Sequence, residues 1–389
     1  MEPIRTEPQP IEALRREAHH ALRAGSFARA SQLWAEIAER IGGVGDWLNL
    51  ATSRRALGDI DGALVAVEAA LRVDPRAFVA LLLKASLLER AGRRGEAMPA
   101  YGDALRLAPP EAQLDPGSRR ALEHARAVNR TYGDALADHL HRQIGAGAAT
   151  TGEARRVAEF ADFMTGRRKA YRQEPMGYFY PGLPAIEFWE REEFPWLADL
   201  EAATDAILDE LRGVITEATE FTPYIDYPDS APLDQWRALN RSRRWGAYHL
   251  LENGKRVEDH CARCPRTMAT LGELPQPTVP NRSPSAMFSA LEARTHIPPH
   301  TGVSNTRLVV HLPLIVPDGC WFRVGNETRT YRPREAWVFD DTIDHEAMNG
   351  SDEGRVILLF DIWNPRLSPW EQEMIGELSG AYDRFHTEL

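Results

Sequence analysis

The sequence predicts two domains of different class, an all-α helical repeat followed by an antiparallel β-sandwich or jelly roll. The chain has 389 residues, which is long enough for two domains that each bury a hydrophobic core. Positions in the first half recur at a spacing of 34 residues. The second half instead contains short apolar runs separated by turn residues, which is the pattern of a β-rich domain.

The repeat is clearest in two copies, GDIDGALVAVEAALRVDP and GRRGEAMPAYGDALRLAP. The copies align through Ala51 and Ala85, Gly58 and Gly92, Ala63 and Ala97, and Pro75 and Pro109. A looser first copy, AGSFARASQLWAEIA, precedes them. The period and the small-residue positions resemble those of the tetratricopeptide repeat. Stacked helix pairs leave a concave face, so the repeat is either a groove for a peptide or partner protein or a rigid spacer or dimerisation arm.

Four segments follow from these patterns. Residues 1–10 are expected to be disordered, and residues 11–145 to hold the repeats and the capping helix SRRALEHARAVNRTYGDALADHLHRQIG. Residues 146–172 begin with the small-residue break GAGAATTGEA and are expected to form a linker helix. The β-rich domain then occupies residues 173–389.

The β-rich domain is expected to combine one long helix with at least six strands. The segment PWLADLEAATDAILDELRGVITEA places Leu200, Ile207, Leu211 and Ile215 on one helical face, which predicts a helix that covers a sheet. The predicted strands are WGAYHLL, SAMFSAL, RLVVHLPLIV, CWFRVG, AWVFDD and RVILLFDIW. The mouth of such a sandwich often holds a metal or a small cofactor.

Net charge, the length of apolar runs and cysteine content argue against several classes of protein. A net charge of −11 argues against a nucleic-acid or anionic-membrane partner. No apolar run approaches the roughly 18 residues of a transmembrane helix, and the first residues lack the apolar core of a signal peptide. Three cysteines are too few for a disulfide framework, so we expect a cytoplasmic protein. Cys261 and Cys264, preceded by His260, could form half of a zinc site, but no second ligand pair follows at finger spacing.

Two of the twelve histidines lie in turn-rich segments beside predicted strands. His300 is in PPHTG before RLVVHLPL, and His345 is in FDDTIDHEAMNG before RVILLF. Loops of this kind can meet at one end of a sandwich, where neutral imidazoles would bind Fe(II) or a similar ion. Hydrogen-bonded loop histidines without a metal are the alternative. A three-ligand iron site would want an acidic residue soon after His300, where the chain has Gly302.

Arg355 suggests a second partner for this site. It opens the apolar strand RVILLF, and an arginine that points into an apolar sandwich needs an anion. A guanidinium binds a carboxylate through two parallel hydrogen bonds, as a dicarboxylate cosubstrate would require. Ser289 and His311 add neutral donors on neighbouring predicted strands. A structural salt bridge between Arg355 and a nearby acid is the alternative.

Residues 174–370 resemble the aspartyl/asparaginyl β-hydroxylases, which are Fe(II)- and 2-oxoglutarate-dependent oxygenases with a double-stranded β-helix core. The matching segments run in order: YPGLPA, FPWLADLE, the loop from Arg294 through PPHTG with SNTRLVVHL, NETRTY, VFDDTIDHEAMN and RVILLFDIWNP. Tetratricopeptide-like repeats also precede the catalytic domain in this family. The resemblance implies O2-dependent hydroxylation of a peptide or protein side chain, at an Asp- or Asn-like β-carbon. The repeats would help to hold that substrate.

The resemblance also implies a role for each matching residue. His300 and His345 would bind the iron. Arg355 and Ser289 would bind the distal carboxylate of 2-oxoglutarate. His311 would lie near the end of the cosubstrate that chelates the metal.

Four further positions concern the substrate and the third ligand position. Arg307 would lie on the substrate side, and Val309 stands where relatives carry a second basic residue, so substrate recognition is expected to differ. Members of the family carry glycine at the position of Gly302, so two histidines alone would hold the iron. We hypothesise that Asp341 accepts a hydrogen bond from water in the vacant position and supports catalysis in this way.

Two other functions stay open. The same cosubstrate chemistry could act on a small molecule, by hydroxylation or, with a halide in the vacant iron position, by halogenation. Alternatively, the chain could be a catalytically inactive repeat-based binding protein. The joint presence of His300, His345, Arg355 and Ser289 argues against the inactive protein, because decay would be expected to remove at least one of them.

Overall fold

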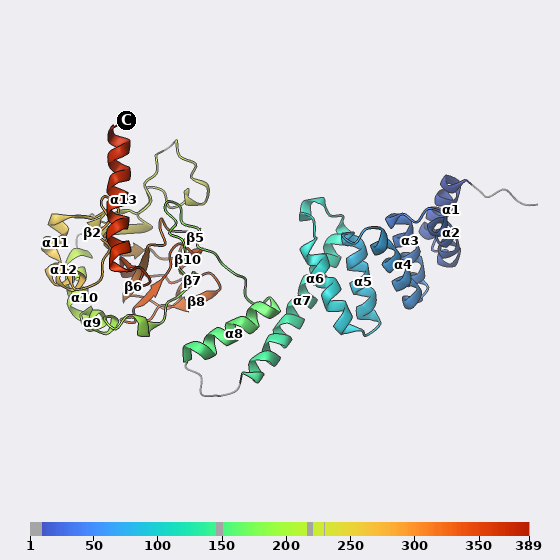
Figure 1. Cartoon of the computed structure of the whole chain (residues 1–389), viewed down its shortest axis with the longest axis horizontal. Coiled ribbons are helices and arrows are strands. Elements are labelled where there is room, and N and C mark those ends of the chain that lie inside the picture. Colours follow the sequence, from blue (N-terminus) through green and yellow to red (C-terminus); the bar gives the residue numbers. More distant parts are fainter. Residues whose placement is uncertain (1–9, 145–150, 216–220, 229, 389) are drawn as a thin grey trace, which may run out of the picture. The chain divides into compact units, whose positions relative to one another are not determined.

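The computed structural model describes residues 10–144, 151–215, 221–228 and 230–388. The chain divides into two compact units, Met1–Arg168 and Lys169–Leu389 (Figure 1). The division lies a few residues before the predicted boundary near residue 172. The disorder predicted for residues 1–10 concerns almost entirely residues outside the described part. No described helix is long and apolar enough to cross a membrane.

The first unit consists of helices joined by short turns. These are α1 (Ile11–Arg23), α2 (Phe27–Arg40), α3 (Val44–Ala56), α4 (Ile60–Val73), α5 (Phe78–Arg90), α6 (Arg94–Arg106), η1 (Glu111–Gln113), α7 (Pro116–Gln143) and α8 (Thr151–Thr165). The recurring alanines of the sequence are fully buried between them: Ala51, Ala63, Ala85 and Ala97. Each small side chain lets two helices approach closely, so one apolar core continues from α1 to α7.

A glycine ends the first helix of each pair. Gly25, Gly58 and Gly92 have φ angles of +73°, +80° and +73°, a backbone conformation that residues other than glycine rarely adopt. Their spacing follows the repeat period. The first, looser copy therefore uses the same turn as the two clear copies, and the helical repeat predicted from the sequence is confirmed.

The cap of α4 offers a test of the repeat turn. The Asp59 carboxylate accepts a hydrogen bond from the Gly62 backbone N–H at 2.9 Å. We expect Asp59→Ala to lower the free energy of unfolding by about 1 kcal/mol, because that N–H loses its partner. Denaturant unfolding measures the change. Asp61→Ala, in the first turn of the same helix, is the matched control and should have a clearly smaller effect.

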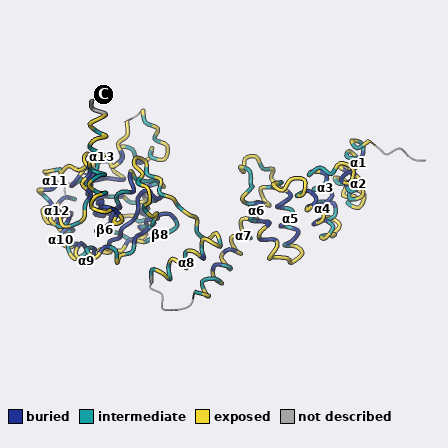
Figure 2. Tube along the Cα trace, in the orientation of Figure 1, coloured by how far each residue is buried: buried dark blue, intermediate teal, exposed yellow. Residues whose placement is uncertain are grey.

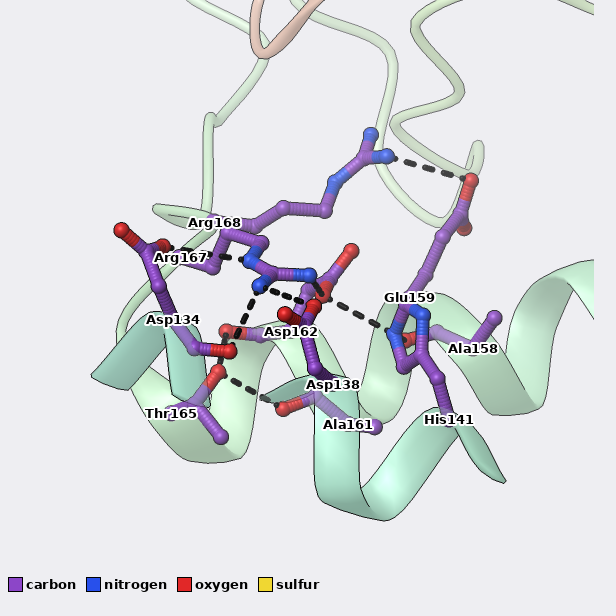
Figure 3. A network of polar contacts seen from close by, with 10 residues as sticks. All are labelled: Asp134, Asp138, His141, Ala158, Glu159, Ala161, Asp162, Thr165, Arg167 and Arg168. Atoms are coloured by element: carbon purple, nitrogen blue, oxygen red, sulfur yellow. Dashed lines mark hydrogen bonds and ion pairs between the residues drawn. The ribbon is translucent and has the colours of Figure 1, made fainter. Parts of the chain in front are cut away.

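Helix α8 packs against α7 within the first unit, through a network of polar contacts (Figure 3). Arg167 donates to the Asp138 carboxylate at 2.7 Å and to the Asp134 backbone carbonyl at 2.8 Å. The His141 Nε2 lies 3.0 Å from Asp162 Oδ1. The helix expected in the linker is therefore anchored to the capping helix.

The second unit contains two antiparallel sheets. The larger sheet has the strand order β1-β2-β4-β11-β6-β9, with β3 paired to β2. Its strands are β1 (Thr222–Pro223), β2 (Trp245–Glu252), β3 (Lys255–Arg256), β4 (Ala286–Leu291), β6 (Arg307–Ile315), β9 (Trp337–Phe339) and β11 (Arg355–Trp363). The smaller sheet has the order β5-β10-β7-β8. Its strands are β5 (Thr295–His300), β7 (Cys320–Val324), β8 (Glu327–Thr330) and β10 (His345–Asn349).

All six predicted strands are present, and β1, β3, β5, β8 and β10 are additional. The sequence placed His300 and His345 in loops, but the structure places them in strands, as the last residue of β5 and the first of β10. The prolines of THIPPH hid β5, because proline lacks the N–H that a strand interior needs and is tolerated at edges. Strand β5 is an edge strand, which explains the difference.

Helices cover one face of the larger sheet. They are α9 (Leu197–Ala202), α10 (Thr204–Ile215), α11 (Glu258–Arg263) and α12 (Pro265–Gly272), with η2 (Arg191–Glu193) and η4 (Asp234–Trp236) in loops and α13 (Pro369–Glu388) at the end of the chain. The single helix predicted for 195–218 is interrupted at Ala203, whose N–H is shared between the carbonyls of Asp199 and Leu200. Residues 216–220 lie outside the described part. Leu200, Ile207 and Leu211 nevertheless enter the core beneath the sheet, as predicted.

The two faces of the larger sheet contribute to two separate cores. Buried residues, drawn in dark blue, gather along the strands of this unit (Figure 2). Strand β6 shows the division: Leu308 and Val310 pack toward the helices, whereas Val309 packs toward the smaller sheet. Because side chains alternate along a strand, His311 shares the face of Val309. The space between the two sheets is where the candidate site lies.

Candidate active site

His300 and His345 meet across the pairing of β5 and β10. The two residues are direct partners in the strand register, and their ring centroids are 4.1 Å apart. The Nδ1–H of His300 donates to the Pro298 carbonyl at 2.8 Å, and that of His345 donates to the Ile343 carbonyl at 3.0 Å. Carbonyl oxygens only accept, so each neutral ring keeps its proton on Nδ1. Both Nε2 atoms then retain a free lone pair, which is the form that binds a metal.

Burial favours the neutral form of both rings. It lowers the pKa of His300, and it lowers the pKa of His345 well below its usual value, with the neighbouring His300 adding to the effect. The aromatic rings of Phe322 and Phe339 pack against His345. The pair therefore presents two unprotonated nitrogens in a largely apolar setting.

The Asp341 carboxylate occupies the place where residue 302 would carry a side chain. A Cβ built on Gly302 would lie 2.0 Å from Asp341 Oδ2 and 2.2 Å from its Cγ. The Gly302 N–H also donates to the Asp341 backbone carbonyl at 2.6 Å. Asp341 Oδ1 is buried and has no hydrogen-bond partner among the described residues. The absence of a side chain at Gly302 therefore leaves room for the Asp341 carboxylate, which comes from a different connection between strands. One oxygen of that carboxylate remains available to bind another group.

Asp341 shares its surroundings with Arg307. The guanidinium Nη2 of Arg307 is 3.6 Å from Asp341 Oδ2, and its Nη1 donates to Asp361 Oδ2 at 2.9 Å. Burial raises the pKa of Asp341 to about 7, although Arg307 acts in the opposite direction. Burial lowers the pKa of Arg307, but Asp341 and Asp361 raise it by more, so Arg307 stays charged.

Arg355 is buried without a carboxylate partner. It is only 2% exposed, and no acid among the described residues forms an ion pair with it. Its Nη1 donates to the Tyr331 hydroxyl at 3.2 Å, and its Nε has no partner in the described part of the chain. The salt bridge considered from the sequence is therefore not formed by the described residues. A buried guanidinium of this kind favours the binding of an anion that the described residues do not supply.

Tyr331 connects Arg355 with His311. The hydroxyl of Tyr331 lies 3.1 Å from His311 Nδ1 and already accepts from Arg355. The arrangement that satisfies all three groups has the hydroxyl donating to Nδ1, which leaves an Nε2–H donor on His311. Burial, with Arg355 adding to it, holds the pKa of His311 well below its usual value, so the ring is neutral. Burial raises the pKa of Tyr331 to about 12, so its hydroxyl keeps its proton.

Ser289 lies on the same sheet face as Arg355. Ser289 is opposite Ile357 in the β4–β11 register, two positions along from the pair of Arg355 and Leu291. Residues in this diagonal relation share a face. The buried Trp245 Nε1–H donates to Ser289 Oγ at 3.2 Å. The hydroxyl hydrogen of Ser289 is then free to donate to an anion at Arg355.

A model of the aspartyl/asparaginyl β-hydroxylase family matches residues 201–365, the range that contains all seven site residues predicted from the sequence. The chain is 27% identical over 249 residues to the human aspartyl/asparaginyl β-hydroxylase, with 61% of this chain covered. It is 32% identical over 199 residues to the ornithine lipid ester-linked acyl 2-hydroxylase of Rhizobium tropici, with 50% of this chain and 67% of that protein covered. The chain belongs to the aspartyl/asparaginyl β-hydroxylase family.

The extent of these likenesses differs between relatives. The chain spans about a third of the length of the human and mouse aspartyl/asparaginyl β-hydroxylases, at 32% and 33%. Among solved structures, it is similar to the TPR2B-domain:pHsp70 complex of yeast Sti1, at 18% identity with a TM-score of 0.27, covering 30% of this chain and 94% of that one. It is also similar to the Yersinia enterocolitica chaperone SycD, at 19% identity and a TM-score of 0.29, covering 31% and 85%.

Four aromatic residues at the candidate site of this β-hydroxylase-family chain were not predicted from the sequence. Trp236 lies edge-on to His300, with ring centroids 5.1 Å apart, and Trp245 is 6.1 Å from the same ring. Tyr224 stacks on Trp245 at 4.2 Å. Trp236 and Tyr224 come from an irregular segment before β2, where periodicity gives no signal. Tyr331, also missed, belongs to the matching segment NETRTY, which could have indicated it.

The cysteine motif does not form a metal site among the described residues. Among all the residues that the structure describes, no group of three or more His, Cys, Asp or Glu side chains is arranged to hold a metal ion. Cys261 and Cys264 are buried free thiols. Burial raises the pKa of Cys264 to about 12, so it stays protonated and is a poor ligand. His260 instead stacks on Tyr248, with ring centroids 3.8 Å apart.

Proposed function

We propose that the chain is an Fe(II)- and 2-oxoglutarate-dependent dioxygenase that hydroxylates a side chain of a peptide or protein. The first candidate is an Asp- or Asn-like β-carbon. One observation carries the proposal: the buried, anion-lacking Arg355 shares an interior with two histidines whose Nε2 atoms are free. A divalent metal fits the histidine pair, and a dicarboxylate fits the unpaired guanidinium.

The residues would divide the work as follows. The Nε2 atoms of His300 and His345 would hold the iron, and Arg355 with Ser289 would hold the distal carboxylate of 2-oxoglutarate. His311 would donate its Nε2–H toward the other end of the cosubstrate. With O2, the bound iron supplies the oxidation that places one oxygen atom in a substrate C–H bond and one in succinate, with release of CO2. The chain itself orients the reactants and excludes water.

The type of β fold, the role of the helical repeat and the cellular location are part of the same proposal. The two facing antiparallel sheets support a double-stranded β-helix, with the metal site between them. The helical repeat would hold a peptide or protein substrate, as its concave architecture allows. Three free, buried cysteines support a cytoplasmic location.

The proposal is tested by cosubstrate turnover followed by product detection. We expect succinate release that requires both Fe(II) and 2-oxoglutarate. Candidate peptides incubated with both should gain 16 Da, measured by mass spectrometry. No binding of 2-oxoglutarate by calorimetry, together with no succinate, would overturn the proposal and favour an inactive binding protein.

A small-molecule substrate is the second candidate. The relative from Rhizobium tropici is named as an acyl 2-hydroxylase of a lipid, so the same family also includes a hydroxylase of a non-protein substrate. Halogenation receives less support, because the Asp341 carboxyl group fills the space beside Gly302 that a halide would need. Chloride-dependent formation of a halogenated product would contradict this preference.

Asp341 gives a direct test of the third ligand position. We expect Asp341→Ala to weaken iron binding or turnover by roughly 10- to 100-fold, because the carboxylate would orient water bound in the position that Gly302 leaves vacant. Iron titration and succinate release measure the change. Asp352→Ala, an exposed acid paired with Arg294, is the control. Unchanged iron affinity together with unchanged turnover in Asp341→Ala would remove the idea.

A further inference from the structure

The charge of Arg307 is already balanced by the chain. Arg307 opens β6 and shares a strand face with Val309 and His311. Its guanidinium contacts Asp361 at 2.9 Å and Asp341 at 3.6 Å. Two carboxylates therefore surround a single cation at the end of the site that Arg307 occupies.

Asp361 is held in place for this contact. It is 1% exposed and accepts hydrogen bonds from Ser283 Oγ at 2.8 Å and from the Ser285 backbone N–H at 2.7 Å. These bonds fix both carboxylate oxygens. Asp361 cannot turn away to release Arg307 without breaking its hydrogen bonds with the buried Ser283 hydroxyl and the part-buried Ser285 N–H, which is unfavourable.

The two arginines of the site are therefore in opposite states. Arg355 has no acid partner among the described residues and donates a hydrogen bond to the neutral Tyr331 hydroxyl. Arg307 has two acids. A carboxylate that enters the site is attracted to Arg355, whereas near Arg307 it meets Asp361 and Asp341 at low dielectric, where like charges repel strongly.

The aromatic residues beside His300 point to the same selectivity. Tyr224 stacks on Trp245, and Trp236 lies against the His300 ring. The faces of these rings carry negative potential, which attracts cations and disfavours anions. Val309, directly opposite Asp361 in the β6–β11 register, adds no positive charge.

We propose that the substrate end of the site accepts a neutral or positively charged group and rejects a carboxylate. Asp361 is the positioning residue that sets this selectivity, because it neutralises Arg307. The inference rests on the proposed function and narrows it: of the pair Asp and Asn, the amide is the better substrate group, and a lysine-like cation is also compatible.

Binding of two size-matched probes tests the selectivity. N-acetyl-asparagine methylamide and N-acetyl-aspartate methylamide differ only in the charged group. We expect calorimetry on the full chain, with Fe(II) and 2-oxoglutarate under nitrogen, to show at least about tenfold tighter binding of the asparagine probe. Equal or tighter binding of the aspartate probe by the unmodified chain would overturn the proposal.

Asp361→Asn should shift the ratio of the two affinities toward the aspartate probe, because it removes one of the two acids that lie beside Arg307. Loss of packing alone would weaken both probes together and leave the ratio unchanged. Ser283→Ala, which removes one hydrogen bond to Asp361 and no charge, is the matched control and should keep the original ratio. A folded Asp361→Asn protein that gains no relative affinity for the aspartate probe contradicts the proposal, even where neither probe binds the unmodified chain.

Titration of 2-oxoglutarate into the same samples tests the proposed function separately. That ligand is assigned to Arg355, which Asp361 does not contact. If the unmodified chain does not bind 2-oxoglutarate, that result counts against the proposed dioxygenase function. It does not count against the proposed preference for the asparagine probe. If Asp361→Asn does not fold, the comparison of the two probes on the unmodified chain still decides.

Discussion

Replacement of His345 by alanine should abolish turnover. His345 would supply one of only two protein nitrogens to the iron. Changes to groups that merely support a ligand weaken metal binding by roughly 10- to 100-fold, so loss of a ligand itself should exceed that range. We expect no succinate above background, and iron titration should show the corresponding loss of affinity.

His296 offers a matched control in the same sheet. It lies on β5, four residues before His300, and its Nε2 is 2.7 Å from Glu346 Oε2, so it is paired away from the histidine pair. His296→Ala should leave iron affinity close to that of the unmodified chain. Equal iron affinity of His345→Ala and His296→Ala would contradict the assignment of His345 as a ligand.

Arg355→Gln should remove most of the affinity for 2-oxoglutarate. The guanidinium is buried, without an acid partner among the described residues, so a bound carboxylate would gain a fully desolvated charge pair. Removal of one partner of such a pair costs about 2–5 kcal/mol, which corresponds to at least roughly 30-fold in affinity. Calorimetric titration of 2-oxoglutarate measures the loss, and iron binding by the two histidines should persist.

The control for Arg355 is an arginine with its own partner. Arg366 pairs with Glu193 at 2.7 Å and lies over the Trp189 ring. Arg366→Gln should bind 2-oxoglutarate as the unmodified chain does. Retention of 2-oxoglutarate affinity in Arg355→Gln, with loss of succinate release, would place the cosubstrate carboxylate elsewhere.

Much of the fold could be predicted from the sequence because it follows from local periodicity. The 34-residue spacing of alanines and glycines has one physical cause in each copy: a small side chain where helices cross and a positive φ where they turn. The apolar runs of β2, β4, β6, β7, β9 and β11 were recognised for the same reason. Strand β5 was missed because its two prolines resemble a loop, and only its position at a sheet edge makes them acceptable.

The residue types of the candidate site could be predicted from the sequence, but the contacts between these residues could not. The sequence alone supplied two strand-flanking histidines and an arginine at the start of an apolar strand, since residue type and local context indicate these. That His300 and His345 face each other depends on the register of β5 against β10, which no local pattern contains. The roles of the aromatic residues at Tyr224 and Trp236 came from packing of an irregular segment and could not be read from periodicity.

The sequence by itself determined that this chain combines a helical repeat with a β-rich domain, and it supplied the side chains of the proposed two-histidine site. Only the tertiary structure decided which charges are free. Gly302 looks like a missing ligand in the sequence, but folding brings the Asp341 carboxylate into that space. The sequence does not distinguish the surroundings of Arg307 from those of Arg355. In the folded chain Arg307 lies beside two carboxylates, and Arg355 has no acid partner among the described residues. Contacts between residues distant in sequence produce both results, because electrostatic pairing acts through space over a few ångströms.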